Sequence, residues 1–467
     1  MSTPTVPARW FATLVALGGA LALRSNDPAL PWILVAWGAT CWAVLTWGLP
    51  RWRVLQLADS GAGGGPPPPA TPSPDAVVPH HASASSSSDD AAGARYGWSH
   101  APAQPAASVG AAVLAALAVR LVVLANGTVS LSDDVYRYVW EGFVLRAGLN
   151  PFVLAPDSVA LSHLRGVETL DGTAVWPLVA HAGIPTIYPP GALALFALLA
   201  PLGALGWRVL GTACDLGTVA LLTRNHPRSG WLWALLPLPA LETAGSGHLE
   251  GPGVLLWLLA MGVGGSPGAA GRQVRPLYAW LGAMVKVLPG LFLLRAGWKR
   301  AGLGAAAALA VVAPFATTTA AHSYATRWSF NGSLFPLAEA ILGAAARPVL
   351  VGIGAAIVGW GLLRVRDPAR LALLASGALV CLSPVVHPWY VLWPLAAALA
   401  VGPTRAQTWR AWEPLAVLVP LAYVVLATYD PTTDVWQERV WPRWIVYVPF
   451  YAALLREGWV RAWTAGG

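Results

Sequence analysis

Apolar segments long enough to cross a bilayer recur along most of this 467-residue chain and constrain its fold more than any other feature. A transmembrane α-helix needs about 20 predominantly apolar residues. The segments are continuous, whereas the strands of a membrane β-barrel alternate apolar and polar residues over about ten positions. Only 11% of the residues are charged, against about 25% in a typical soluble protein. We therefore expect an all-α polytopic membrane protein, a bundle of roughly 12 to 14 transmembrane helices with a large first extracytoplasmic loop.

Composition divides the chain into three parts. Residues 1–57 contain two apolar runs and predict an N-terminal transmembrane hairpin. Residues 58–107 are rich in glycine, proline and serine, and such a segment cannot bury enough apolar surface to fold, so we expect a disordered cytoplasmic linker. Residues 108–467 form the main transmembrane body. Its apolar runs lie at 108–126, 190–206, 207–223, 230–245, 250–264, 276–294, 301–319, 347–364, 370–385, 388–402, 412–428 and 443–456.

The arginines indicate the orientation of the chain. The formal net charge of +8 resides largely in short loops between apolar runs, which is typical of cytoplasmic loops and does not indicate a nucleic-acid partner. Arg51 and Arg53 place the linker inside, so the loop 128–187 lies outside. Between residues 190 and 300 simple alternation puts arginines outside, and we therefore favour two re-entrant or half-length segments there. We expect a multi-pass protein of the inner (plasma) membrane with its active site on the extracytoplasmic side.

The first external loop concentrates acidic residues. The segment Leu131–Gly142 reads LSDDVYRYVWEG and contains Asp133, Asp134 and Glu141, although the whole chain has only 21 acids. Ser132 or Asp133 would cap a helix here. An acid at a membrane boundary is typical of a catalytic base or an ion ligand, and a capped surface helix with internal ion pairs is the structural alternative. At helical spacing one face carries Asp134, Arg137, Tyr138 and Glu141.

Ionisable side chains also occur within the apolar part of the chain, where they are costly unless they are used. His248 and Glu250 lie in a glycine-rich break between two apolar runs, where they would bind an anion and orient hydroxyl groups of a ligand. Lys286, one of two lysines in the chain, lies inside an apolar run and needs an anionic partner. That partner is a phosphate or, as the structural alternative, Asp215 or Glu242.

Two aromatic motifs begin apolar runs. Tyr188 precedes two prolines, which are favoured at the first position of a helix, so a structural role and a binding role are equally open. His387 precedes Pro388-Trp389-Tyr390 at an expected external helix start, where it would contact phosphate or sugar or act as an ordinary interfacial histidine.

The segment DDVYRYVWEG, followed by Gly148-Leu-Asn-Pro-Phe152, resembles the first external loop of GT-C glycosyltransferases, which are membrane enzymes that use polyprenyl-phosphate sugars. It is most similar to that of bacterial α-(1→6)-mannosyltransferase-like proteins. The resemblance covers about residues 108–456 and leaves out the hairpin and linker. Further motifs of that group follow in order, namely PTIYPP at 185–190, GHLE at 247–250, KVLP at 286–289, FNGS at 330–333 and HPWY at 387–390.

The resemblance implies that residues 108–467 are a GT-C-like catalytic body. Its function would be the inverting transfer of a hexose, expected to be mannose, from polyprenyl phosphate to a glycolipid or polysaccharide acceptor. Asp134 would be the catalytic base, with Asp133 as the second candidate. No cofactor and no metal ligand are predicted, although the two aspartates would be able to hold a divalent cation. The substrate-binding residues would be Arg137, Tyr138, Glu141, Tyr188, His248, Glu250, Lys286 and His387.

Two other functions remain open. A multi-pass transporter or flippase of lipid-linked substrates also places ionisable residues in apolar helices, but the long acid-bearing loop and the lack of a visible internal repeat argue against it. A non-catalytic scaffold with a degenerate transferase body is the second, and the intact acid cluster argues against it. The chain has no P-loop and no dinucleotide-binding glycine motif, which favours a lipid-linked donor over a nucleotide.

Overall fold

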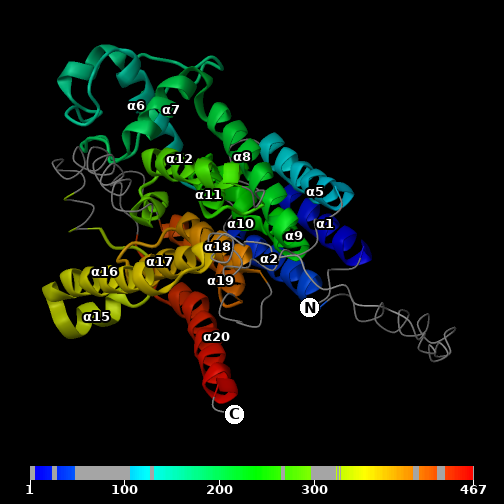
Figure 1. Cartoon of the computed structure of the whole chain (residues 1–467). Coiled ribbons are helices and arrows are strands. Elements are labelled where there is room, and N and C mark those ends of the chain that lie inside the picture. The colour runs from blue at the N-terminus through cyan, green and yellow to red at the C-terminus, as the bar shows by residue number, and fades with distance from the viewer. Residues whose placement is uncertain are drawn as a thin grey trace, which may run out of the picture.

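The computed structural model describes residues 6–23, 29–47, 106–126, 131–264, 269–295, 322, 326, 328–402, 410–428 and 437–465. Within them the chain is all-helical, and its only extended pairings are isolated bridges (Figure 1), which confirms the expected all-α class. Three helical stretches in these residues are long and apolar enough to cross a membrane: Ala107–Ala125, Pro190–Asn225 and Phe335–Arg364. Residues 58–105 of the predicted linker and the run 301–319 lie outside the described residues.

The helices follow the predicted apolar runs. In the N-terminal half they are α1 (Val6–Leu21), α2 (Leu30–Trp47), α5 (Ala106–Ala125), α6 (Asp134–Arg146), α7 (Pro190–Leu199), α8 (Gly203–Asn225), α9 (Pro227–Leu235), α10 (Pro237–Ala240), α11 (Glu250–Met261) and α12 (Ala269–Val285). In the C-terminal half they are α15 (Phe335–Leu342), α16 (Ala346–Arg364), α17 (Pro368–Leu382), α18 (Leu392–Val401), α19 (Trp412–Leu418) and α20 (Trp441–Ala465). Short 3-10 segments, such as Leu288–Arg295, Pro388–Val391 and Val419–Thr428, complete several of the runs.

The segment between residues 190 and 245 departs from regular crossings. The predicted runs 190–206 and 207–223 belong to one helical stretch of 36 residues, which at about 1.5 Å per residue is much longer than a bilayer is thick. The run 230–245 is broken instead, because Pro237 has no N–H to continue α9 and a π-helix, Leu241–Gly245, follows α10. The predicted re-entrant or half-length segments stay a prediction.

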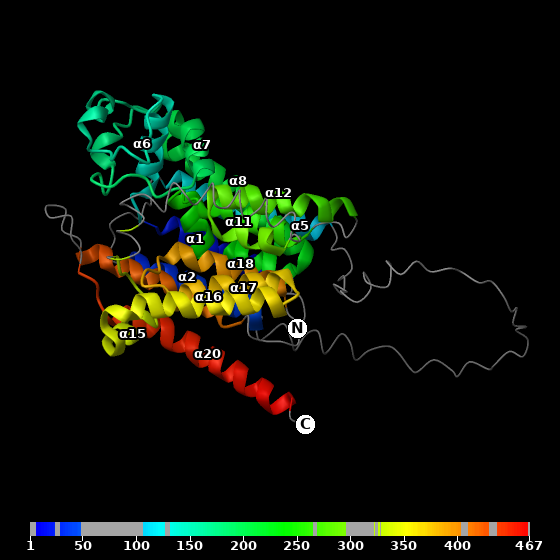
Figure 2. The ribbon, with the colours of Figure 1, turned by 60° about the vertical axis from the view of Figure 1, so that its left-hand side comes forward.

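Helices α6 and α7 form a lobe that projects from the helical body (Figures 1 and 2). Tyr138 of α6 stacks on Phe196 of α7 with ring centroids 4.7 Å apart, and Trp207 of α8 packs edge-on against both rings. Gly142 allows this packing, because a Cβ atom there would overlap the carbonyl oxygen of Phe196. The aromatic cluster therefore fixes the helix that carries the acidic residues.

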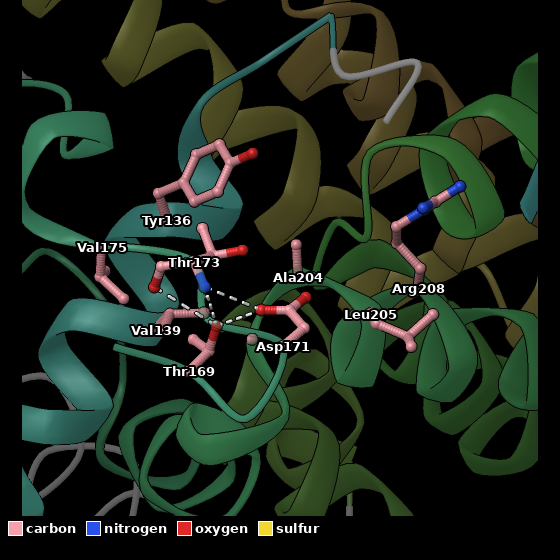
Figure 3. A pocket seen from close by; sticks show the side chains of 10 residues that line it. Tyr136, Val139, Thr169, Asp171, Thr173, Val175, Ala204, Leu205 and Arg208 are labelled. Carbon is pink, nitrogen blue, oxygen red and sulfur yellow. Dashed lines mark hydrogen bonds between the residues drawn. The ribbon is translucent and has the colours of Figure 1, made fainter. Parts of the chain in front are cut away.

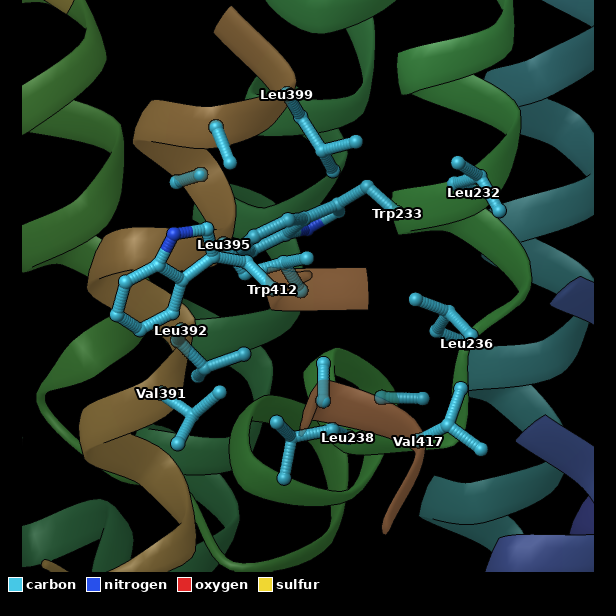
Figure 4. Packing of buried hydrophobic residues seen from close by; sticks show 14 of the residues in the cluster. Leu232, Trp233, Leu236, Leu238, Val391, Leu392, Leu395, Leu399, Trp412 and Val417 are labelled. Carbon is cyan, nitrogen blue, oxygen red and sulfur yellow. The ribbon is translucent and has the colours of Figure 1, made fainter. Parts of the chain in front are cut away.

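The N-terminal hairpin is packed into the same apolar core as the body. The indole N–H of Trp37 donates to the carbonyl oxygen of Leu235 at 2.8 Å, and that of Trp42 donates to Glu413 at 2.7 Å. Glu413 also receives two hydrogen bonds from Arg228, at 2.7 and 2.8 Å. Figure 4 shows the neighbouring core, in which side chains of α9, α18 and α19 interdigitate.

The position of α6 should depend on the glycine at its contact with α7. We expect Gly142→Ala to lower the free energy of unfolding by about 1–3 kcal/mol, the usual cost of overpacking, because the new methyl group forces α6 from α7. Gly110→Ala on α5 is the matched control, since no heavy atom lies within 4 Å of the added Cβ. Thermal unfolding in detergent measures both variants, and equal midpoints would contradict the close contact.

Candidate functional site

Asp134 is the first residue of α6 and lies at the base of the lobe. The hydroxyl oxygen of Ser132 accepts a hydrogen bond from the Asp134 backbone N–H at 3.3 Å, whereas Asp133 occupies the cap position without a side-chain cap bond. Asp133 is exposed and Asp134 is half-buried. No side chain among the described residues pairs with the Asp134 carboxylate in an ion pair or hydrogen bond. The positive end of α6 favours its negative charge.

Two tyrosines lie close to this carboxylate. Tyr138 and Tyr188 pack edge-on with ring centroids 5.1 Å apart. Burial raises the pKa of both phenols well above their usual range, and the negative charge of Asp134 raises it further. Asp134 therefore interacts electrostatically with both Tyr138, near the start of the external loop, and Tyr188, just after its end.

Arg137 binds the protein itself. Its Nε donates to Glu141 Oε1 at 2.6 Å, in a pair that is buried on both sides. Its remaining donors bind the end of the external loop, so the predicted role of Arg137 in substrate binding stays a prediction. The acceptors are the carbonyl oxygens of Ala180, His181 and Ile184.

Glu141 connects the same helix to Tyr188. The Thr186 hydroxyl donates to Glu141 Oε2 at 2.6 Å and accepts from the Tyr188 backbone N–H at 3.1 Å. Burial raises the pKa of Glu141, and the Arg137 guanidinium and the Thr186 hydroxyl partly oppose this. Through Thr186, Glu141 therefore holds Tyr188 in position. The contact of Glu141 with substrate stays a prediction.

His248 is fully buried and is held by a second acid. Its Nδ1 lies 2.8 Å from Glu242 Oε2, and the Tyr423 hydroxyl donates to Glu242 Oε1 at 2.6 Å. Nε2 of His248 is buried without a hydrogen-bond partner among the described residues. The sequence named Glu242 as an alternative partner of Lys286, and it gave no signal for Tyr423, because no motif joins two residues 181 positions apart.

Lys286 pairs with neither of its expected protein partners. Its Nζ lies 2.9 Å from Glu250 Oε1, and its side chain is 25% exposed, whereas that of Glu250 is buried. Asp215 instead pairs with Arg120 at 2.6 Å. Glu242 binds histidine, as described above. This ion pair connects the motif at 247–250 to the motif at 286–289. From the sequence, only the order of these motifs along the chain was known.

His387 lies in an aromatic stack. Its ring is parallel to that of Trp389, with centroids 4.3 Å apart, and Trp389 lies 4.1 Å from the ring of His248. Tyr390 contacts His387 edge-on, and the Lys286 ammonium lies 5.8 Å from the centroid of the Tyr390 ring. The motif at 387–390 thus supplies flat aromatic surface next to the two cations.

The structure brings most of the predicted site residues to one place. Asp134 and Glu250 interact electrostatically with His248, and His248 and Lys286 do so with His387. The arrangement can hold an anion at the two cations, present aromatic faces and take up a proton at Asp134. The residues that meet come from α6, the end of the external loop, the start of α11, the end of α12 and the segment before α18: Asp134, Tyr138, Tyr188, His248, Glu250, Lys286 and His387.

A small cavity of about 100 Å³ lies elsewhere in the lobe (Figure 3). Its lining includes Tyr136, Asp171 and Arg208 and none of the predicted site residues. Asp171 accepts hydrogen bonds from Thr169 and Thr173, and these bonds lower its pKa. This acid therefore stabilises a turn of the external loop. Among the described residues no three His, Cys, Asp or Glu side chains gather as a metal site.

Comparison of the chain with protein-family models, with curated proteins and with solved structures found no match. The functional argument therefore depends on the chemistry of these side chains.

Glu141 should make stability depend on pH in a direction opposite to most carboxylates. Its pKa is raised above the ordinary value of 4.5, so the folded protein binds this proton more tightly than the unfolded chain. The contribution is therefore fully present below pH 4.5 and is lost as pH rises through the folded pKa. Melting temperatures of wild type and Glu141→Gln, measured across this range, should differ increasingly in favour of wild type as pH falls. A difference that shrinks on acidification would contradict this sign.

Proposed function

We propose that the protein is an integral-membrane glycosyltransferase with a GT-C-like body of 108–467, which transfers a hexose from a polyprenyl phosphate to a glycolipid or polysaccharide. The observation that carries the proposal is the charge pattern of the site. Glu242 has His248 and Glu250 has Lys286 within ion-pair distance, whereas Asp134 has no such basic partner among the described residues. A carboxylate that faces the same site without a cation is free to take up a proton.

In the proposed reaction Asp134 accepts the proton of an acceptor hydroxyl group. The oxygen attacks the anomeric carbon of the donor as the bond from that carbon to the phosphate oxygen breaks. Polyprenyl phosphate leaves with the bonding electrons, and a single displacement of this kind inverts the anomeric configuration. The negative charge that develops on the leaving phosphate is stabilised by His248 and Lys286, which is the usual task of cations in such a site.

The aromatic residues suit the sugar. The ring of Trp389 lies against His248 and that of Tyr390 lies close to the Lys286 ammonium, so both supply flat apolar faces next to these basic groups. A lipid-linked donor reaches such a site along the bilayer. In the apolar stretch Phe335–Arg364, which contains α15 and α16, only 11% of the most apolar window is buried. On this proposal the mannose identity of the hexose and the extracytoplasmic location of the site follow from the sequence resemblance and the loop charges. They remain parts of the proposal, as does the number of crossings.

Replacing the proposed base should abolish transfer without unfolding the protein. Membranes that contain Asp134→Asn should transfer label from radiolabelled polyprenyl-phosphate mannose at least about 100-fold more slowly than wild type, the usual contribution of a general base. Asp171→Asn is the matched control, because that acid lies in the same lobe but lines the separate cavity. Asp133→Asn decides between the neighbouring aspartates.

Two results would count against this mechanism. Transfer at the wild-type rate in both Asp134→Asn and Asp133→Asn, with folding preserved, would remove the proposed base. Movement of the labelled lipid across the membrane without transfer to any acceptor would favour the flippase alternative.

The pair of Lys286 and Glu250 separates a binding role from a structural one. Lys286→Met alone should destabilise the protein, because it leaves Glu250 buried without its cation. Lys286→Met/Glu250→Gln removes both charges and should restore the melting temperature. Its transfer rate should stay about 100-fold below that of Glu250→Gln alone, since the cation for the phosphate is missing. Equal rates in these two variants would make the ion pair purely structural.

A further inference from the structure

We propose that Glu242 and Tyr423 are positioning residues, which hold His248 as an imidazolium and direct its Nε2–H into the site as a donor to an anionic oxygen. The inference rests on the proposed function for the identity of that oxygen, a phosphate oxygen of the donor. The state of the histidine itself depends only on its contacts.

Glu242 is the middle of three side chains in contact, with His248 on one side and Tyr423 on the other. Glu242 lies in the π-helix Leu241–Gly245, and π-helical turns are frequent at functional sites. The backbone N–H of His248 donates to the Glu242 carbonyl oxygen at 2.9 Å, while the two side chains meet at 2.8 Å. Two contacts to one residue fix both the backbone and the ring plane of His248.

The contacts of Glu242 determine its charge. Its side chain is completely buried, and its two oxygens have one partner each: Oε1 accepts from the Tyr423 hydroxyl, and Oε2 lies 2.8 Å from Nδ1 of His248. A hydrogen bond donated to a carboxylate favours its ionised form, and an imidazole at this distance is the base that takes the proton. A buried carboxylate requires a cation. Among the described residues only His248 lies within ion-pair distance of Glu242, so His248 carries the positive charge.

The other ring nitrogen of His248 is Nε2. Since Nδ1–H donates to Glu242, the second N–H of the imidazolium is at Nε2, which is buried without a partner among the described residues. A buried donor is normally satisfied, so an open one marks a place for a ligand. The groups that face this ring from neighbouring elements are Asp134, Glu250, His387, Tyr423 and Trp389. An incoming anion would therefore meet Nε2–H together with Lys286.

Nitrogen NMR of histidine-labelled full-length protein in lipid nanodiscs tests the charge state directly. The chain has nine histidines, and the His248 signals are those lost in His248→Gln. We expect both ring nitrogens of His248 to be protonated in wild type and only one in Glu242→Gln. Tyr423→Phe should shift the Nδ1 signal in the same direction by less. Glu413→Gln removes an acid that is buried to the same extent but pairs with Arg228, and it should leave the His248 signals unchanged.

Titration with inorganic phosphate tests the ligand. It should shift the Nε2 signal of wild type, and the apparent Kd should be about tenfold weaker in Glu242→Gln, since a neutral donor binds an anion less well than a charged one. A neutral His248 in wild type, or signals that do not respond to Glu242→Gln, would overturn the positioning role. The absence of a phosphate-induced shift in wild type would overturn the anionic ligand.

The sugar-transfer assay separates this inference from the proposed function. If no membrane preparation transfers sugar but the His248 signals respond as expected, the positioning role stands and the transferase fails. If transfer depends on Asp134 while His248 ignores Glu242→Gln, only the positioning role fails.

Discussion

Ionisable side chains buried among apolar helices have to be neutralised where they lie, because the surrounding medium does not solvate them. In this protein that constraint selects which segments meet. Arg120 of α5 pairs with Asp215 of α8, and Arg228 of α9 pairs with Glu413 of α19. Both pairs join segments that are far apart in sequence. The second also receives Trp42 of the hairpin, so the N-terminal hairpin is fixed to the body by the same charge that holds two body helices together.

The pairs around the site differ from these structural pairs in what they leave open. The guanidinium of Arg120 also donates to the carbonyl oxygens of Trp233 and Ala234, so most of its hydrogen-bonding capacity is used. His248 keeps a buried nitrogen without a partner in the described part of the chain, and Lys286 remains partly exposed. Unused hydrogen-bonding capacity at a buried place is what a ligand needs, and at His248 it occurs among the predicted motifs.

The sequence predicted the helical class and the order of the motifs, but it did not predict which of their side chains would pair. Apolar runs reveal helices because each run buries its own backbone hydrogen bonds, and this needs no knowledge of neighbours. Neither of the two protein partners predicted for Lys286 was right. Hydropathy shows that a lone cation in an apolar run is costly, but it does not show which helix lies beside that cation. The union of the runs 190–206 and 207–223 was missed for a related reason. A short 3-10 turn, Ala200–Leu202, follows α7 directly, and Gly203, with φ of 59°, takes up the change in backbone conformation before α8.

The same charge pairs weigh on the choice between a transferase and a transporter. Alternating access requires one group of helices to rock against another around a central site. Here buried pairs connect α5 to α8 and α9 to α19, and the hairpin is joined to the second of them. Breaking a buried pair costs about 3–5 kcal/mol. Large relative movements of these helices would therefore be opposed by this free energy in every transport cycle. A body braced in this way is better suited to holding a base, two cations and an aromatic surface at fixed distances, which is what a single displacement at an anomeric carbon requires.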